Sequence, residues 1–288
     1  MLRVGIIGTD GGEKSGHSGL ICRMIASGKY DAEVTAVMGD DEEETLEVAR
    51  LSESSPCIAK NLDELLEKCD AVMILHRNGN HHTRPCIKAL KAKKAVFVDK
   101  PLACTVEDAE IMIKTAKESN AVLHSGSYLC YAPALAEIKK AVKEKENIRS
   151  VYISFPLVQF PDAGGIHFYS HHILTEFLTV FDEPIKSVYA MKTGENIAVV
   201  ADAGSFPVFF NYSVAYPSFH FGVYFADGTN IFKEIDLADS DEHQLKAFLE
   251  AAHRGDAHDD YNKQLIPVKL SCAIEKSLET GIKTDIIN

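Results

Sequence analysis

The sequence predicts an α/β protein of two domains, with a doubly wound parallel sheet first and an α+β domain with a predominantly antiparallel, open sheet second. Over residues 1–125, short apolar runs alternate with amphipathic helical stretches, as in parallel strands that helices cover on both faces. From Ile148 onward, β-rich runs partly alternate apolar with polar residues, which indicates a sheet with one open face. This change predicts domains over 1–125 and 126–288, with the C-terminal helix able to pack back on the first.

The elements of the first domain follow one another as strand and helix. Residues 3–8 are expected to form a buried strand that ends in a glycine, and 71–75 a strand that is apolar on both faces. The other expected strands are 33–38, 95–98 and 121–124, and the expected helices are 19–27, 42–52, 61–68, 83–93 and 105–119.

The second domain is expected to begin with a helix over 133–145. Strands are then expected at 150–156, 185–192, 197–201, 208–215, 219–225 and 230–235, and helices at 172–181, 242–254 and 265–280. Six aromatic residues are assigned to the open sheet face: Phe209, Phe210, Tyr212, Phe219, Phe221 and Tyr224. Because large apolar patches rarely stay exposed on monomers, this face predicts a homo-oligomer.

Composition argues against several classes of partner. The chain has 288 residues, of which 46% are hydrophobic and 25% charged, and its formal net charge of −12 opposes nucleic-acid binding. No apolar run reaches the roughly 18 to 20 residues that cross a bilayer, and no export leader precedes the first strand. Seven scattered cysteines without Cys-x-x-Cys are expected to be free thiols, with no metal site. We therefore expect a cytoplasmic protein without membrane or nucleic-acid partners.

A glycine-rich segment joins the first strand to the first helix. Glycines there let the backbone approach a pyrophosphate, and the helix N-terminus adds N–H groups and a positive dipole end. The loop is longer than G-x-G-x-x-G, so its βαβ context carries the prediction of a Rossmann dinucleotide site. The expected contacts are Gly8, Thr9, Asp10, Gly11, Gly12, Gly16 and His17.

Two alternatives for this segment stay open. It could be a plain flexible turn between strand and helix. It could also be an ATP-binding P-loop, because Lys14 and Ser15 fit G-x-x-x-x-G-K-[ST]; however, Glu13 stands where that pattern needs glycine.

The end of the second strand bears on the choice of cofactor. An acid there often binds the ribose hydroxyls of the cofactor, and this position falls at Gly39 or Asp40. The acids that follow would repel a 2′-phosphate, so Asp40 predicts NAD, with NADP less favoured. The alternative is that these acids only stabilise a helix N-terminus.

The most specific stretch runs from Val96 to Ala103, where a buried strand ends in Asp99, Lys100 and Pro101. Ligands of open α/β sheets bind beyond the carboxyl ends of strands. There Lys100 could hold a substrate hydroxyl and stabilise developing alkoxide charge. The alternative is a solvated lysine on a turn.

Asp99-Lys100-Pro101-Leu102-Ala103 resembles the Glu-Lys-Pro-Leu-Ala signature of the Gfo/Idh/MocA oxidoreductase family. Asn80-His81-His82-Thr83 is similar to the family's Asn-His-x-His helix start, and Asp162 to Gly165 with the histidines that follow is similar to its catalytic segment. The resemblance implies a Rossmann domain, a sheet domain that binds substrate and NAD(P)-linked oxidation of a carbinol. Expected cofactor contacts at the third and fourth strand ends are Arg77, Asn78, His82, Asp99 and Lys100.

The histidines at 167–172 are the candidates for an acid/base. The resemblance implies an Asp and a His four residues apart, and the distance to Glu183-Pro184 favours His172, with His171 as the other possibility. Phe168 stands four residues before His172, and His167 stands four residues before His171. Neither candidate therefore has the expected Asp. Three alternatives stay open: structural histidines, a metal site of His167, His171 and His220, and a site that binds cofactor without turnover.

The other departures from the family concern the pocket lining. The family often has an arginine before an aromatic-x-Pro, but the segment from Tyr128 to Pro133 has none; Tyr128, His167 and His220 are assigned to the substrate. Arg77 could bind the pyrophosphate, steer an anionic substrate or be solvated. The sequence thus predicts an NAD-dependent oxidoreductase of sugars, cyclitols or related polyols. The alternative is a catalytically degenerate nicotinamide-binding sensor or structural paralogue.

Overall fold

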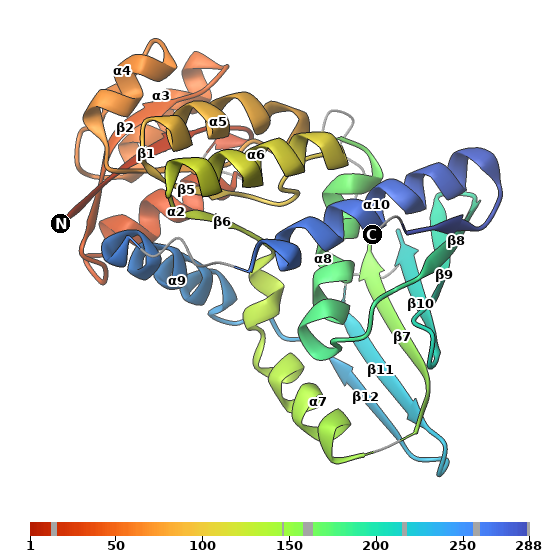
Figure 1. Cartoon of the computed structure of the whole chain (residues 1–288). Helices are drawn as coiled ribbons and strands as arrows, with labels where there is room; N and C mark the ends of the chain where they lie inside the picture. The colour runs from red at the N-terminus through yellow and green to blue at the C-terminus, as the bar shows by residue number, and fades with distance from the viewer. Residues whose placement is uncertain (13–15, 146, 158–163, 215–217, 256–259, 287–288) are drawn as a thin grey trace. The chain divides into compact units, whose positions relative to one another are not determined.

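The computed structural model describes residues 1–12, 16–145, 147–157, 164–214, 218–255 and 260–286, and the chain forms two compact units (Figure 1). The first unit comprises Met1–Gly126 and Glu242–Gln264, and the second comprises Ser127–Asp241 and Leu265–Asn288. Within the described residues, no helix combines the length and apolarity needed to cross a membrane.

The first unit contains a six-stranded parallel sheet in the order β3-β2-β1-β4-β5-β6. The strands are β1 (Leu2–Ile7), β2 (Ala32–Met38), β3 (Cys57–Ile58), β4 (Ala71–Ile74), β5 (Ala95–Val98) and β6 (Leu123–Ser125). The chain winds outward from β1 to β3 and then returns to β4 on the other side of β1. Ligands of doubly wound sheets bind where the winding reverses, so a ligand site is expected at the carboxyl ends of β1 and β4.

Helices cover both faces of this sheet. They are α2 (His17–Ala26), α3 (Glu42–Leu51), α4 (Leu62–Lys68), α5 (Thr83–Lys91), α6 (Val106–Ser119) and α9 (Ser240–Arg254), with the 3-10 helix η1 (Gly79–His81). On one face, apolar residues of α2, α3 and α9 form a single core with the sheet. On the other, Gly5 lies so close to Leu65 of α4 that an added Cβ would sit 2.7 Å from its Cδ2.

The placement of α9 differs from the contiguous division expected at residue 125. Phe248 of α9 packs against Phe97 of β5, with ring centroids 5.5 Å apart, and Leu245 and Leu249 are buried in the same core. The apolar face of α9 therefore completes the core of the first unit, and residues 242–264 belong to that unit. The change of sequence pattern near residue 125 cannot show that a later helix packs into the core of the first unit.

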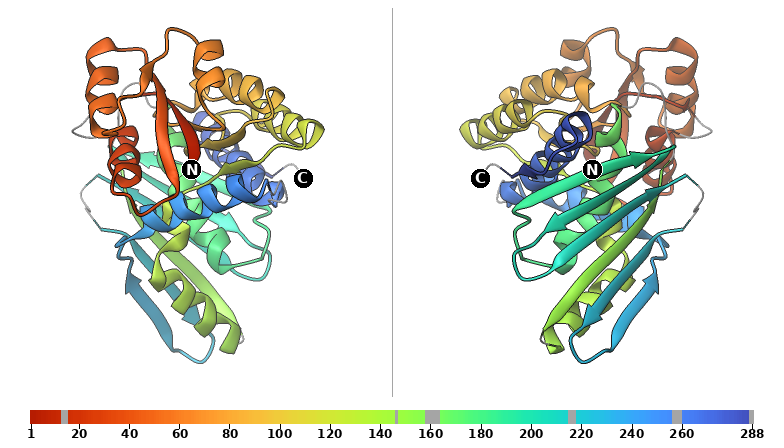
Figure 2. Two further views of the ribbon diagram at one scale, coloured as in Figure 1. Left: turned by 90° about the vertical axis from the view of Figure 1, so that its left-hand side faces the viewer. Right: turned by 90° about the vertical axis from the view of Figure 1, so that its right-hand side faces the viewer.

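The second unit contains a seven-stranded sheet in the order β12-β11-β7-β10-β9-β8-β13. Its strands are β7 (Ile148–Pro156), β8 (Ser187–Thr193), β9 (Asn196–Asp202), β10 (Pro207–Ser213), β11 (His220–Phe225), β12 (Asn230–Glu234) and β13 (Thr284–Asp285). Its helices are η2 (Tyr128–Tyr131), α7 (Pro133–Glu144), α8 (Ile166–Val180) and α10 (Tyr261–Thr280). Among the described strands of this sheet, only β7 and β10 pair in parallel, as the right-hand view of Figure 2 shows. The predicted fold class is thus confirmed.

Some predicted elements were wrong in extent. Helix α8 begins at Ile166 rather than 172, directly after Gly165, whose φ of 65° ends the preceding segment. Helix α10 begins at Tyr261 rather than 265. The strands β3 and β13, each of two residues, were missed because a pair of residues shows no periodicity. Residue 215, the predicted end of one strand, lies outside the described residues.

The predicted open face is also corrected. Phe210, Tyr212 and Phe221 are buried in the core of the second unit, because side chains alternate between the two faces of a strand. Phe209 and Tyr224 do lie on the open face, 39% and 41% exposed.

Candidate functional site

The glycine segment makes a tight turn after β1. Gly8, Gly11 and Gly12 have φ angles of 86°, 87° and 51°, a backbone region that favours glycine. A Cβ on Gly8 would lie 2.5 Å from the backbone nitrogen of His76, and one on Gly16 would lie 2.7 Å from the carbonyl oxygen of Gly12. The turn therefore needs its glycines at both ends. Lys14 and Ser15, on which a P-loop would depend, lie outside the described residues.

Helix α2 offers donors for an anion at this turn. It begins at His17, and its N-cap, Gly16, supplies no side-chain hydrogen bond. The amides of an uncapped first turn point away from the helix and carry the positive end of its dipole. These groups fit the pyrophosphate of a dinucleotide.

The other residues of the turn bind neighbouring elements. The hydroxyls of Thr9 and Thr45 are 3.2 Å apart and buried, and Asp10 Oδ2 accepts a hydrogen bond of 2.8 Å from the backbone N–H of Arg77. Glu44 Oε1 accepts a hydrogen bond of 3.1 Å from the Gly11 N–H. Thr9 and Asp10 thus hold the turn in place, and α3 directs a carboxylate toward it.

The acidic side chain that follows β2 belongs to Asp40, because the structure leaves room only for glycine at position 39. A Cβ at Gly39 would fall 1.9 Å from Thr9 Oγ1 and 2.5 Å from Thr45 Oγ1, so no other residue fits there. The Asp40 side chain is 81% exposed.

The Asp-Lys-Pro segment forms a buried cluster of charge at the end of β5. Asp99 and Lys100 are each only 5% exposed, and His17 Nδ1 lies 3.2 Å from Asp99 Oδ2. Burial raises the pKa of Asp99, but the charge and hydrogen bond of His17, together with Lys100, outweigh it and hold the pKa well below its usual range. Burial lowers the pKa of Lys100 to about 7; Asp99 opposes this shift and Arg77 adds to it.

Lys100 is therefore poised to gain or lose a proton near neutral pH. It is also held beside a carboxylate that stays ionised. Such a lysine suits a site where an oxygen changes its charge.

Two residues assigned to the cofactor contact the protein itself. Both ring nitrogens of the fully buried His82 face carbonyl oxygens, Nδ1 at 2.8 Å from Pro101 and Nε2 at 2.9 Å from His76. Burial is the main cause that lowers the pKa of His82. Asn78 Oδ1 accepts the Asn80 N–H at 3.0 Å and caps η1. His82 thus joins the loops that follow β4 and β5, and has no ring nitrogen left for a ligand.

In the second unit, His172 lies in an aromatic pocket. Its ring stacks on Phe155 at a centroid distance of 5.3 Å, and Tyr128 meets it edge-on at 5.5 Å. Its Nδ1 lies 2.6 Å from Ser127 Oγ. Because Ser127 Oγ accepts a hydrogen bond from the Leu129 N–H, its own proton is available to His172. Ser127 thus fixes the orientation of the His172 ring, and sequence reasoning did not find this contact.

The remaining histidines are placed differently. His167 Nδ1 lies 3.1 Å from Ser271 Oγ, and its Nε2 lies 3.1 Å from Glu275 Oε2, so both nitrogens bind α10. His220 stacks on Phe232 at 5.5 Å, and His171 is buried. The three do not form a metal-binding group among the described residues. His167 thus links α8 to α10, and its assignment to the substrate stays a prediction.

Comparison with known proteins defines the class of the first unit. Residues 2–127 match the family described as "Oxidoreductase family, NAD-binding Rossmann fold". The first unit thus carries the NAD-binding domain of the Gfo/Idh/MocA oxidoreductase family, as its Asp-Lys-Pro segment predicted.

Individual relatives agree with this assignment. An uncharacterized oxidoreductase of Streptococcus pneumoniae serotype 4 is 27% identical over 146 residues, which are 50% of this chain and 37% of that protein. The 2,7-anhydro-N-acetylneuraminate hydratase of Escherichia coli K12 is 28% identical over 146 residues, or 50% and 36%. The match therefore spans little more than a third of either relative.

The fold of the whole chain has solved counterparts. The structure of scyllo-inositol dehydrogenase from Lactobacillus casei with bound NAD(H) and scyllo-inositol superposes with a TM-score of 0.82, covering 99% of this chain and 99% of that one. The sequence identity is 15%, so this likeness shows the fold.

Proposed function

We propose that the protein is an NAD-dependent oxidoreductase that transfers hydride between the nicotinamide and a CH–OH carbon of a sugar, cyclitol or related polyol. The observation that carries the proposal is Lys100, buried beside Asp99 at the carboxyl end of a strand in an NAD-binding Rossmann unit. When bound, the nicotinamide supplies the hydride chemistry.

The cofactor residues follow from the first unit. Gly8, Gly11, Gly12, Gly16 and the first turn of α2 would hold the pyrophosphate through backbone amides. Asp40 would accept the ribose hydroxyls. Its charge and those of the acids that open α3 favour NAD over NADP, because each would repel a 2′-phosphate.

The chemical roles fall to two side chains. Lys100 would bind the substrate oxygen and stabilise its developing charge, while Asp99 and His17 hold the ammonium in position. His172 would accept the hydroxyl proton, with Ser127 fixing the ring and its tautomer. His171 remains the other candidate for the base.

The polyol class rests on a structural relative, whose name states scyllo-inositol as its ligand. A cytoplasmic location belongs to the same proposal and is supported by the seven cysteines, none of which forms a disulfide within the described residues.

We also propose a homo-oligomer formed through the open face of the second sheet. Strand register aligns Tyr189, Val200 and Phe209 in one row across β8, β9 and β10, and they are 40%, 44% and 39% exposed. The row continues through Tyr152 and Gly222 to Phe232, which is 52% exposed. An apolar row of this length favours a second copy of the same face.

The test is NADH formation from NAD across a panel of sugars and cyclitols. We expect turnover with at least one of them and a loss of at least about tenfold in Lys100→Ala. Lys91→Ala, an exposed lysine of the same unit, is the control and should keep full activity. NADH binding without turnover on any substrate would instead select the degenerate sensor.

A further inference from the structure

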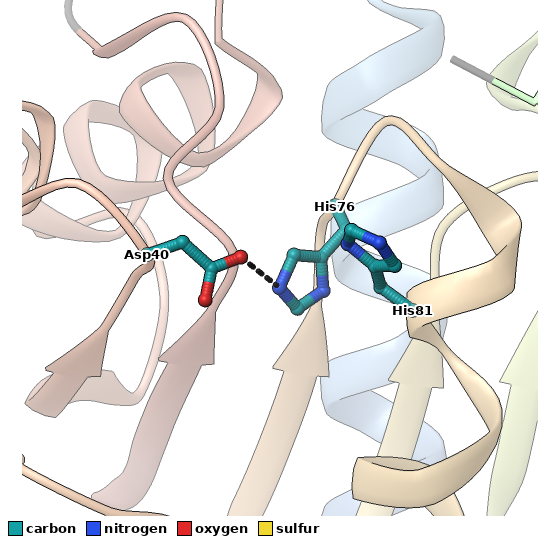
Figure 3. A group of neighbouring side chains, drawn as sticks. All are labelled: Asp40, His76 and His81. Carbon is teal, nitrogen blue, oxygen red and sulfur yellow. Dashed lines mark ion pairs between the residues drawn. The ribbon is translucent and has the colours of Figure 1, made fainter. Parts of the chain in front are cut away.

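We propose that Asp40, His76 and His81 form a binding site for one divalent transition-metal ion of the zinc class, which overlaps the cofactor edge of the first unit. One ligand atom from each of these side chains lies within 4.8 Å of the others (Figure 3). They come from the segment after β2, the segment after β4 and the end of η1.

The state of the His76 ring points to a ligand. The ring is 8% exposed, and its Nδ1 is buried with no hydrogen-bond partner among the described residues. Its Nε2 lies 3.9 Å from Asp40 Oδ2, beyond hydrogen-bond distance. A buried imidazole normally satisfies its nitrogens, so the unpartnered Nδ1 leaves this ring short of a contact. The other nitrogen, Nε2, faces the Asp40 carboxylate across a gap that has room for a bridging ion.

The donors suit zinc and related ions. Two imidazoles and one carboxylate are the ligands of many open Zn²⁺ sites, which keep a fourth position for water. At Zn–N and Zn–O distances of about 2.0–2.2 Å, tetrahedral ligands lie roughly 3.4 Å apart. The ligand atoms here lie within 4.8 Å of one another. Rotation of the exposed Asp40 and His81 side chains could bring them to the shorter spacing, whereas buried His76 stays fixed.

The neighbouring residues support this arrangement. The ring of His81 is perpendicular to that of His76, with centroids 5.5 Å apart. His82 cannot compete as a ligand, because both of its nitrogens face carbonyl oxygens, and one of these belongs to His76. His82 therefore fixes the backbone that presents His76.

The site shares its position with the proposed cofactor contacts. His76 packs against the turn at Gly8, and Asp40 is the residue proposed to bind the ribose. If the proposed function holds, the metal ion and the dinucleotide cannot both use Asp40. Zinc would then weaken NAD binding.

The test measures zinc binding to the purified, reduced protein by competition with a chromophoric chelator. We expect one ion per chain, with affinity falling at least about tenfold in His81→Ala and in Asp40→Asn. Both side chains are exposed, so the variants should fold. His253→Ala is the control, because His253 lies 3.8 Å from Asp31 in the same unit but belongs to no group of three metal-binding side chains among the described residues. It should bind zinc like the native chain.

Unchanged zinc affinity in His81→Ala would overturn the site, as would a cobalt spectrum with thiolate charge-transfer bands. A second arm compares NAD affinity with and without zinc. We expect zinc to weaken NAD binding in the native protein and not in His81→Ala. Equal NAD affinity in the native protein would refute the overlap. No NAD binding at all, with zinc bound through His81, would count against the proposed function alone.

Discussion

The two units treat buried ionisable side chains in opposite ways. In the first, Asp99 and Lys100 are adjacent in the chain, and His17 lies 3.2 Å from the Asp99 carboxylate. In the second, Glu176 of α8 is completely buried, and neither of its oxygens has a hydrogen-bond partner among the described residues. Burial therefore raises the pKa of Glu176 well above its usual value, and the group is held neutral.

Burial and the neighbouring groups together decide whether a buried side chain keeps its charge. Burial alone favours the neutral form, and only nearby opposite charges or donors restore the charged one. The first unit supplies these partners where a ligand would need charge. The second unit instead surrounds His172 with aromatic rings and a hydroxyl, groups that carry no charge.

The largest effect should appear at Lys100, in the pH dependence of stability. Its pKa of about 7 in the folded chain lies below its ordinary 10.5, so between these values the unfolded chain binds more protons. The native chain should therefore gain stability relative to Lys100→Met as pH rises through this window. The gain is roughly 1.4 kcal/mol per pH unit.

Urea unfolding at pH 6 to 10 measures this difference. Lys91→Met, on the surface of the same unit, should show no such slope. A flat difference for Lys100→Met would mean that the lysine titrates normally.

Glu176 should give the opposite dependence of stability on pH. Its folded pKa is raised, so above about pH 4.5 the folded chain holds a proton that the unfolded chain has lost. Native stability should fall relative to Glu176→Gln as pH rises, since glutamine stays neutral. Glu279→Gln, at an exposed position of α10, is the matched control. Parallel stability curves for native and Glu176→Gln would show that Glu176 is ionised and partnered.

The His172 pocket makes a smaller prediction, which concerns turnover. Ser127→Ala should lower kcat by about tenfold and change its pH profile, with little change in KM, because the serine only orients the ring. Ser205→Ala, an exposed serine of the same unit, should leave kcat unchanged. An unaltered pH profile in Ser127→Ala would separate the serine from the chemistry.

The smallest prediction concerns the carboxylate at the glycine turn. Glu44→Gln can keep the hydrogen bond to Gly11 while removing a negative charge near the proposed pyrophosphate site. NAD affinity should rise a few-fold by calorimetry. Glu43→Gln, exposed on the same turn of α3, should have a smaller effect. A loss of affinity in Glu44→Gln would show that the carboxylate helps to build the turn.

The two units also differ in how far their sequence predicts them. Asp99 and Lys100 follow a strand directly, so the topology of a parallel sheet alone places them at its ligand edge. The pairing of Ser127 with His172 joins residues 45 positions apart, and no local pattern contains it. His76 was overlooked because only the fold brings it to Asp40. Residues 242–264 were assigned to the wrong unit for the same reason, since their contacts lie far back in the chain.

We propose above all that the first unit binds a pyridine dinucleotide through the turn after β1. Isothermal titration of the full chain with NAD and with NADH tests it most directly. We predict saturable heat with one site per chain, and a loss of affinity in Gly8→Ala because its Cβ would collide with the backbone of His76. The absence of heat from both nucleotides, with a correctly folded protein, would contradict the account.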